Sequence, residues 1–370
     1  MGIGFSFPAN YSKDQITKLK DILNKKNGTN YADYIADIYG SLPYSFIGHS
    51  RFPKDVPNIS IDKLEWYISE LHKIKIPFYF VMNNPWSQAR ERLKVGRALI
   101  FKELRSLIDI GIDGVILANP YLIKLIHKNF PELTITTSTN LQISSYIQIK
   151  NYIDFGVDYV VLGRDINRNF KLLKKLFKDF SNNLILLANT SCLLFCPLTL
   201  YHPLITGHIS TLKLNSDIKS NKVSEDEIID EGFCFNYCMD KITTQPESIL
   251  KSPWIRPEDV IHYEKIGLKF LKIQGRTMKV DDQISLLKGY LKRRTPNDDL
   301  FFLWPNFRNR LIKFVQKNPS PERKDYNFQI RNSDLKKNGF FKFFLTSNRD
   351  CRKGCAECQH CETVFKKILI

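Results

Sequence analysis

The sequence predicts an α/β protein built on a (β/α)8 barrel of the TIM type, with a long cysteine-bearing loop after the seventh strand and a basic C-terminal extension. Short apolar runs alternate with stretches of helical periodicity, and each run ends in small or polar residues. Eight such runs can be counted, which is the number of strands that a closed barrel of this type requires. An open, doubly wound sheet is the alternative fold.

The eight apolar runs are expected to form buried parallel strands, because each is short and nearly continuous. They lie near residues 3–10, 36–42, 77–84, 114–120, 133–140, 158–165, 183–191 and 270–276. Several of the segments between them begin with Ser, Asp or Pro and end with Gly, as helices do. Crossover helices are expected near residues 12–26, 59–74, 86–111, 142–156, 256–267 and 281–293.

The barrel is expected to span residues 1–296, including the loop 192–254 between the seventh and eighth strands. Loops of this length in compact domains are usually functional. From residue 297 the composition becomes basic and aromatic, so residues 297–370 are expected to form a separate extension. Residues 301–370 hold 15 Lys and Arg against 6 Asp and Glu, in a chain with a formal net charge of +17.

This charge indicates an anionic small molecule or a macromolecular substrate, and RNA or an acidic protein would bind through the basic C-terminal segment. A genome-wide bias toward Lys, Asn and Ile is an alternative explanation. No run approaches the roughly 18 apolar residues of a membrane helix, so no membrane insertion is expected. The N-terminus lacks the basic start and the cleavage site of a signal peptide, which indicates a cytoplasmic protein.

All eight cysteines fall into two groups of four. The first group lies in the long loop as two C-x3-C pairs, Cys192, Cys196, Cys234 and Cys238, and the second, Cys351, Cys355, Cys358 and Cys361, lies in the motif CRKGCAECQHC. Four thiolates bind either zinc or an iron–sulfur cluster, so both groups are predicted to be metal sites. Disulfides are less favoured, because disulfide scaffolds are small and cysteine-dense, whereas here a long cysteine-free region comes first.

The polar residues that follow the predicted strands should converge on one mouth of the barrel, and they are mostly amides. Arg164 and Arg276 follow the sixth and eighth strands and would favour a carboxylate or phosphate ligand, with ion pairs at the rim as the alternative. His202 and His208 lie in the cysteine loop and are candidates for catalytic residues that face the substrate. Because this loop starts at the mouth, its first cysteines should lie at the active-site end.

The C-terminal motif begins with the C-x3-C-x2-C spacing of the radical S-adenosylmethionine signature. That assignment is disfavoured, because those enzymes usually carry the motif after the first barrel strand and because Cys361 supplies a fourth ligand here. A closed site with four thiolates suits a structural or an electron-relay role. Zinc and a second 4Fe–4S cluster both remain open for this site, and a partner subunit or electron donor is a further expectation.

Several stretches between residue 36 and about residue 293 resemble the U32, or collagenase-like, peptidase family. They are DIYGSLP with GHSRFP, GIDGVILANPYLIKLIHKNFPELTITTSTN, GVDYVVLGRDINRNF, CLLFCPLTLYHPLITGHIS and SPWIRPEDVIHYEKIGLKFLKIQGR. The resemblance implies a barrel whose catalytic loops lie at the cysteine-bearing end. Several branches of this family resemble oxygen-independent hydroxylating systems for quinone precursors or RNA bases, some with prephenate as the source of the hydroxyl group. They use a four-cysteine 4Fe–4S cluster, which the resemblance carries over to Cys192, Cys196, Cys234 and Cys238.

The chain departs from the peptidase signature of this family. That signature has a Glu and a Gly before its first cysteine and another Gly between its first two cysteines, whereas this chain reads LLANTSCLLFC. We therefore expect an iron–sulfur-dependent modifying enzyme that hydroxylates, or acts by related redox chemistry on, RNA, a quinone precursor or a peptide. The alternatives are a U32-type peptidase and a non-enzymatic, metal-stabilised subunit that binds RNA or protein.

Overall fold

The computed structural model describes residues 2–24, 34–211, 232–347 and 350–368, and it contains the predicted barrel of eight parallel strands. The strands are β1 (Gly4–Pro8), β2 (Ile35–Gly40), β3 (Phe78–Met82), β4 (Gly114–Leu117), β5 (Thr134–Thr137), β6 (Val160–Val161), β7 (Leu184–Leu187) and β8 (Phe270–Lys272). Their order in the sheet is β5-β4-β3-β2-β1-β8-β7-β6, so the first strand pairs with both the second and the eighth. The predicted fold class is confirmed, and each predicted strand is present.

The barrel is nearly closed, with its weakest join between β5 and β6. A single bridge, between Thr136 and Tyr159, links these two strands. The backbone N–H of Thr137 donates to the Tyr159 carbonyl at 2.8 Å, and the backbone N–H of Val161 donates to the Thr137 hydroxyl at 3.0 Å. A side chain therefore supplies part of the hydrogen bonding that a ladder supplies elsewhere.

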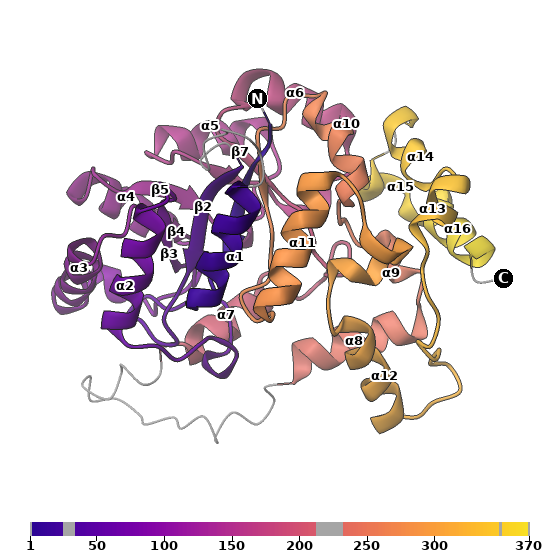
Figure 1. Ribbon diagram of the computed structural model, residues 1–370, viewed down its shortest axis with the longest axis horizontal. Helices are drawn as coiled ribbons and strands as arrows, with labels where there is room; N and C mark the ends of the chain where they lie inside the picture. The colour runs from indigo at the N-terminus through magenta and orange to yellow at the C-terminus, as the bar shows by residue number, and fades with distance from the viewer. Residues whose placement is uncertain (1, 25–33, 212–231, 348–349, 369–370) are drawn as a thin grey trace.

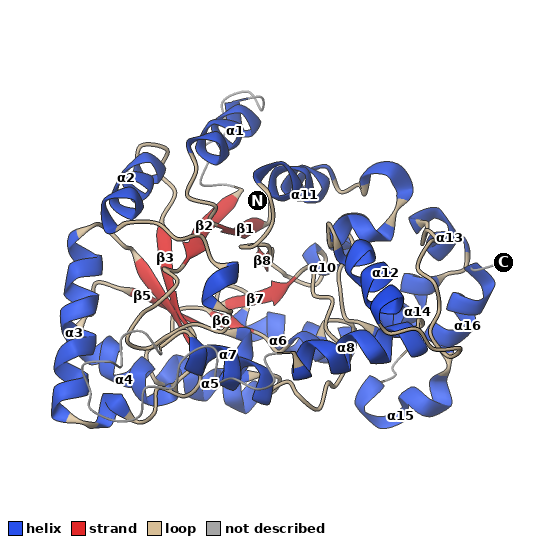
Figure 2. Ribbon diagram, turned by 90° about the horizontal axis from the view of Figure 1, so that it is seen from below, coloured by secondary structure: helices blue, strands red, loops and turns tan. Residues whose placement is uncertain are grey.

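Helices surround the strands, and the barrel side of the molecule is seen with its strands in red in Figure 2. They are α1 (Lys13–Asn24), α2 (Ile61–His72), α3 (Lys94–Asp109), α4 (Pro120–Asn129), α5 (Tyr146–Asp154), α6 (Phe170–Phe180), α10 (Val260–Glu264) and α11 (Val280–Lys292). Side-chain oxygens of Ser60, Asn119 and Ser145 cap the starts of α2, α4 and α5. The helix predicted from residue 86 begins only at Lys94, because the left-handed backbone just before it interrupts the helical path.

The predicted loop 192–254 is partly helical where it is described. It contains α7 (Tyr201–Ile209), α8 (Phe233–Thr244) and α9 (Ser248–Lys251), and its residues 212–231 lie outside the described residues. This insertion follows β7 and therefore starts at the barrel mouth, as expected.

The C-terminal extension consists of α12 (Phe307–Lys317), α13 (Asn332–Lys337), α14 (Phe340–Thr346), α15 (Cys351–Cys358) and α16 (His360–Ile368), which lie together on one side of the barrel in Figures 1 and 2. It packs on the insertion, since α12 contacts α8 and α16 contacts α9. The Trp304 indole N–H donates to the Asn189 carbonyl at 2.9 Å. The division of the chain at residue 296 stays a prediction.

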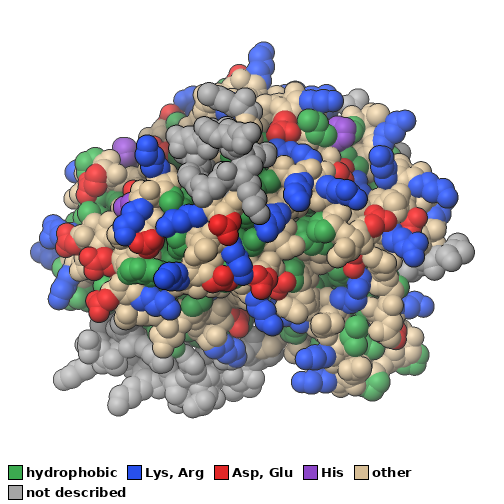
Figure 3. Space-filling view, viewed as in Figure 1, with side chains coloured by type: hydrophobic (Ala, Val, Ile, Leu, Met, Phe, Trp, Pro, Cys, Tyr) green, Lys and Arg blue, Asp and Glu red, His purple; other side chains and the backbone are tan. Residues whose placement is uncertain are grey.

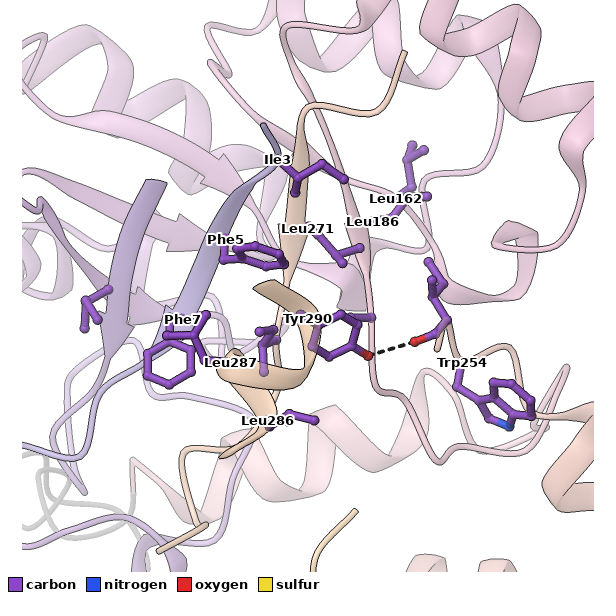
Figure 4. Packing of buried hydrophobic residues seen from close by; sticks show 14 of the residues in the cluster. Ile3, Phe5, Phe7, Leu162, Leu186, Trp254, Leu271, Leu286, Leu287 and Tyr290 are labelled. Carbon is purple, nitrogen blue, oxygen red and sulfur yellow. Dashed lines mark hydrogen bonds between the residues drawn. The ribbon is translucent and has the colours of Figure 1, made fainter. Parts of the chain in front are cut away.

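One continuous apolar core joins the barrel to the extension. In Figure 4, Phe5 and Phe7 of β1 lie against α11, whose Tyr290 donates its hydroxyl proton to the Ile255 carbonyl at 2.7 Å. The fully buried Trp254 stacks on Phe340 of the extension, with ring centroids 5.5 Å apart. A second, smaller apolar cluster of Tyr39, Tyr79, Val81 and Ile116 is separate from this core. Three of its members also line the cavity at the mouth, so this cluster forms the cavity floor.

Candidate active site

A cavity of about 310 Å³ opens at the mouth of the barrel. Side chains from the strand ends, the insertion and α12 line it together. The predicted site residues found there are Cys192, Cys196, Cys234, Cys238, Arg164, Arg276 and His202. The structure therefore brings all four cysteines of the first group and both predicted arginines to one place.

The four thiols reach this cavity from two elements. Cys192 and Cys196 lie in the segment after β7, and Cys234 and Cys238 lie one turn apart on the same face of α8. Burial, together with smaller contributions from the thiols of Cys192 and Cys196, raises the pKa of Cys238 to about 12. Four thiolates in this position need a cationic centre to offset their charge, and their donor chemistry fits zinc or an iron–sulfur cluster.

The second group of cysteines lines a different cavity, of about 440 Å³. Its members are Cys351, Cys355, Cys358 and Cys361, and Arg168 lies with them. Within residues 2–24, 34–211, 232–347 and 350–368, no three His, Cys, Asp or Glu side chains are placed to hold a metal ion as they stand. Each set of thiols surrounds a cavity, and metal ligation at both sets stays a prediction.

Arg164 is a cation close to the first group of thiols. Its side chain is only 8% exposed, and its Nη2 donates to the Thr199 hydroxyl at 2.9 Å. Burial acts to lower the pKa of Arg164, but the charges of Cys192 and Asp165 outweigh this effect and raise it overall. Its Nε is buried with no hydrogen-bond partner among the described residues, which leaves one donor for a ligand.

Arg276 is the second predicted cation, and its Nη1 donates to the Ser41 hydroxyl at 2.9 Å. Burial lowers the pKa of Arg276 to about 10, and neighbouring Arg51 contributes to the decrease. The side chain still remains charged at neutral pH. Nε of Arg51 is also buried without a partner in the described part of the chain. Two arginines therefore hold buried donors that no described protein atom uses.

Sequence reasoning missed three further cations that line the cavity, namely Arg51, Lys272 and Arg310. The described residues that line it include no Asp or Glu, so the mouth is strongly positive. Arg51 lies in the quoted motif GHSRFP, and Lys272 is the single lysine in the apolar run FLKI, which is a signal for an inward-facing charge. Arg310 comes from α12, and nothing in the local sequence places it at the barrel mouth.

Lys272 lies on the floor of the cavity, above the Tyr39 ring, with its Nζ 3.3 Å from the ring centroid. Nζ donates to the Ser6 hydroxyl at 3.2 Å, and that hydroxyl donates to Asp37 at 2.7 Å. Burial lowers the pKa of Lys272, whereas Asp37 opposes the shift. Asp37 is thus held in the barrel interior and does not serve the mouth as an acid.

The two predicted histidines have different positions. His202 lines the cavity, and burial together with Arg51 and Arg164 lowers its pKa, so the imidazole is neutral at neutral pH. His208 is not among the lining residues, and its Nδ1 lies 2.8 Å from Nε2 of Gln88. The structure therefore brings His202 to the site but not His208.

The amides at the mouth join neighbouring loops. Asn140 donates through Nδ2 to the Ser50 hydroxyl at 2.7 Å and to the Asn83 carbonyl at 3.0 Å. Asn83 in turn donates to the Ser138 hydroxyl at 3.0 Å. These bonds fix the loops after β2, β3 and β5 relative to one another, so the amides position the mouth.

Lowering the pH is expected to destabilise the protein through His49, which is fully buried near Arg276. Burial lowers the pKa of His49 from 6.5 to about 3, so between these values the unfolded state binds more protons than the folded state. Stability therefore falls as the pH falls below 6.5, by as much as about 3 kcal/mol at pH 4. Urea unfolding at pH 7 and pH 4 measures this loss. His49→Gln should reduce it, and an unchanged loss in the variant would contradict the assignment.

These features define the class of the protein: it is an α/β barrel whose mouth is lined by thiols and is positively charged. Residues 32–176 match the model of Peptidase family U32. "Uncharacterized protease MJ1657" from Methanocaldococcus jannaschii is 23% identical over 356 residues, which are 96% of this chain and 94% of that protein. The resemblance to the U32 family that the sequence indicates is thereby confirmed.

Two shorter matches carry another name. "tRNA hydroxylation protein P" from Escherichia coli is 25% identical over 124 residues, and its counterpart from Haemophilus influenzae is 27% identical over 124 residues. Each match covers 33% of this chain and 26% of the relative, so the chain spans about a quarter of those proteins. Among solved structures, that of "the U32 Peptidase Mk0906" is 14% identical, covers 74% of this chain and 94% of that chain, and has a TM-score of 0.49.

Proposed function

We propose that this chain is an iron–sulfur-dependent modifying enzyme that acts on RNA at the barrel mouth, by hydroxylation or related redox chemistry. Cys192, Cys196, Cys234 and Cys238 would hold a 4Fe–4S cluster there. The observation that carries the proposal is the meeting of these four thiols with five Lys and Arg side chains in one cavity. A cluster in this position would supply one-electron redox chemistry next to a bound anion.

The arrangement of the thiols supports a cluster. A 4Fe–4S cluster binds each thiolate at a different iron, so its ligands surround a volume. The four thiols line one cavity from two elements, and Arg164 lies beside them with an unused donor. The role of Arg164 is to offset the negative charge of the thiolates and to hold part of the substrate next to them.

The substrate is proposed to be an anion because the buried Nε atoms of Arg51 and Arg164 have no described partner. A phosphate or carboxylate oxygen is the acceptor that a guanidinium favours. Aromatic side chains of Phe52, Tyr201, Phe233 and Phe235 line a small adjoining pocket of about 110 Å³. Bases stack on such side chains, and two relatives are named for tRNA hydroxylation, so RNA is the proposed substrate class.

The outer surface also suits a polyanion. Lys and Arg side chains are spread across the face shown in Figure 3, with Asp and Glu interspersed among them. No helix among the described residues is both long and apolar enough to cross a membrane. RNA binding that uses phosphate contacts should depend strongly on salt. We expect the affinity for unmodified tRNA to fall at least tenfold between about 50 and 200 mM salt, as measured by filter binding. Salt-independent binding would contradict an RNA substrate.

A peptidase is the second candidate, because the relative that matches nearly the whole chain carries the name protease. Hydrolysis would need an activated nucleophile or a metal with an open position. Burial raises the pKa of Cys196 and Cys238, which disfavours a free thiolate nucleophile. The described lining residues offer no carboxylate as a base. Cleavage of a peptide library by protein that lacks iron would support the peptidase.

Iron analysis tests the proposed function directly. Anaerobically purified protein is expected to contain iron and sulfide and to absorb broadly near ~400 nm, because iron bound to thiolates absorbs there and zinc does not. Cys234→Ala should lower the iron content and abolish tRNA modification. Ser191→Ala is the matched control, since Ser191 lines the same cavity without offering a thiol. Wild-type protein that holds zinc, with no iron and no sulfide, would overturn the proposal.

A further inference from the structure

The second cavity has the features of a charged centre that faces the barrel. The four C-terminal thiols line it together with Arg168, which belongs to the segment after β6. Cys361 and Cys351 lie deeper, where they pack against the apolar core, and the thiol of Cys361 has its pKa raised to about 12 by burial. The site thus has a buried side toward Arg168 and an outer side toward solvent.

Arg168 carries a buried charge that needs an anionic neighbour. The side chain is 6% exposed and lies over the rings of Trp254, Phe340 and Phe344, at 4.4, 5.1 and 5.0 Å from their centroids. Its Nη1 donates to the Leu250 carbonyl at 2.6 Å, and its Nε has no partner among the described residues. An uncompensated buried guanidinium is costly, and a centre with four thiolates supplies the missing negative charge.

The two cysteine cavities are separated by a thin layer of chain. Arg164 lines the mouth cavity, whereas the next residue, Asp165, lines the C-terminal cavity. Leu193 and Leu194 are divided between the two cavities in the same way. Consecutive Cα atoms lie only about 3.8 Å apart, so the two cavities share a wall at these residues, although the cysteines that line them are far apart in the sequence.

We infer that Cys351, Cys355, Cys358 and Cys361 hold a second 4Fe–4S cluster, through which the mouth site passes electrons to an oxidised one-electron carrier protein. A zinc ion would serve to fold a small module, but this extension already shares its core with the barrel through Phe340, Val364 and Phe365. Proximity to the mouth on one side and to solvent on the other suits the transfer of electrons from the mouth to a carrier at the surface. Hydroxylation withdraws electrons from the substrate, so each transfer moves one electron outward from the mouth cluster, which is oxidised, through the second cluster to the carrier, which is reduced. No bond is formed or broken in this transfer.

The relay role rests on the proposed function of the mouth, but the identity of the second metal does not. Metal analysis separates the two. Anaerobic wild-type protein should contain about eight irons and about eight sulfides, the content of two 4Fe–4S clusters. Cys358→Ser and Cys238→Ser should each lose about half of the iron, and Ser347→Ala, at the same C-terminal cavity, should lose none. If the wild type contains zinc, and only Cys358→Ser loses it, the second cluster is overturned. The proposed 4Fe–4S cluster at the barrel mouth would be unaffected by that result. If iron is lost from Cys358→Ser but not from Cys238→Ser, the proposed cluster at the barrel mouth is overturned instead.

Electron paramagnetic resonance tests whether the two sites are neighbours. Dithionite-reduced wild type should give a broadened or split spectrum from two interacting clusters, and each cysteine variant should give the simple spectrum of one cluster. Two unperturbed, additive spectra in the wild type would overturn the relay.

Arg168 is a positioning residue for the C-terminal centre, so Arg168→Met should shift the reduction potential of that cluster to more negative values. The mouth cluster should keep its potential, and Arg168→Lys should restore much of the shift. Equal shifts at both clusters, or none, would contradict this role, and the cysteine variants test the site even where an Arg168 variant fails to fold.

Discussion

Replacing Arg276 by Met is expected to weaken tRNA binding by about 2 kcal/mol, roughly 30-fold, because the substitution removes a buried cation from the lining of the cavity that we propose binds an anion. Arg276 lies beside Arg51 and bonds only one described side chain, Ser41, so most of its guanidinium is available to a ligand. Fluorescence anisotropy with labelled tRNA measures the loss.

The exposed Arg105 of α3 provides the control for this prediction, since Arg105→Met removes the same charge far from the mouth. Thermal unfolding should show that Arg276→Met folds at least as well as the wild type, because it removes a buried charge that costs desolvation free energy. Equal losses of affinity in the two variants would mean that the cavity does not bind the RNA.

Replacing Trp254 by Ala is expected to lower the free energy of unfolding by about 3–5 kcal/mol. The side chain is fully buried, and its indole N–H donates to the Ile249 carbonyl at 2.7 Å. It packs between Arg168 and the extension, where it stacks on Phe340. The substitution therefore removes a contact between barrel and extension in addition to leaving a cavity.

Guanidinium unfolding measures this loss, with Trp66→Ala as the control. Trp66 is 38% exposed on α2, so its loss should cost much less. Hydrogen exchange in Trp254→Ala should increase most in α14 and α16, which pack together on this side. Similar destabilisation by both substitutions, with no change in those helices, would contradict a linking role for Trp254.

The barrel could be predicted because each of its strands is a short run that is buried on both faces, and such runs are visible in the sequence without any partner. The helix α8, by contrast, could not be predicted from the sequence. Its Phe233 and Phe235 are exposed while its other face packs on α12, which lies some 70 residues further along the chain. Its amphipathic pattern is therefore weak, and its stability depends on a contact that local periodicity does not report.

The residues of the site also fall into those that could be predicted from the sequence and those that could not. Arg164 and Arg276 were predictable because they follow strands, and strand ends meet at one mouth. Lys272 lies inside a strand, where a single charge in an apolar run can indicate an inward-facing side chain but does not show what it faces. Its place at the cavity becomes clear only when the strands form a barrel. Arg310 reaches the mouth only through the packing of α12, a tertiary contact with no local signal.

The mouth is completed by residues near the C-terminal end of the chain, and this constrains the order of events in cotranslational folding. Phe307 and Arg310 line the cavity, and the Trp304 indole bonds to Asn189 at the end of β7. Synthesis runs from the N-terminus, so all eight strands leave the ribosome before these residues do. The wall of the cavity around the first group of thiols is therefore completed only after residues 304–310 have left the ribosome and packed on the barrel.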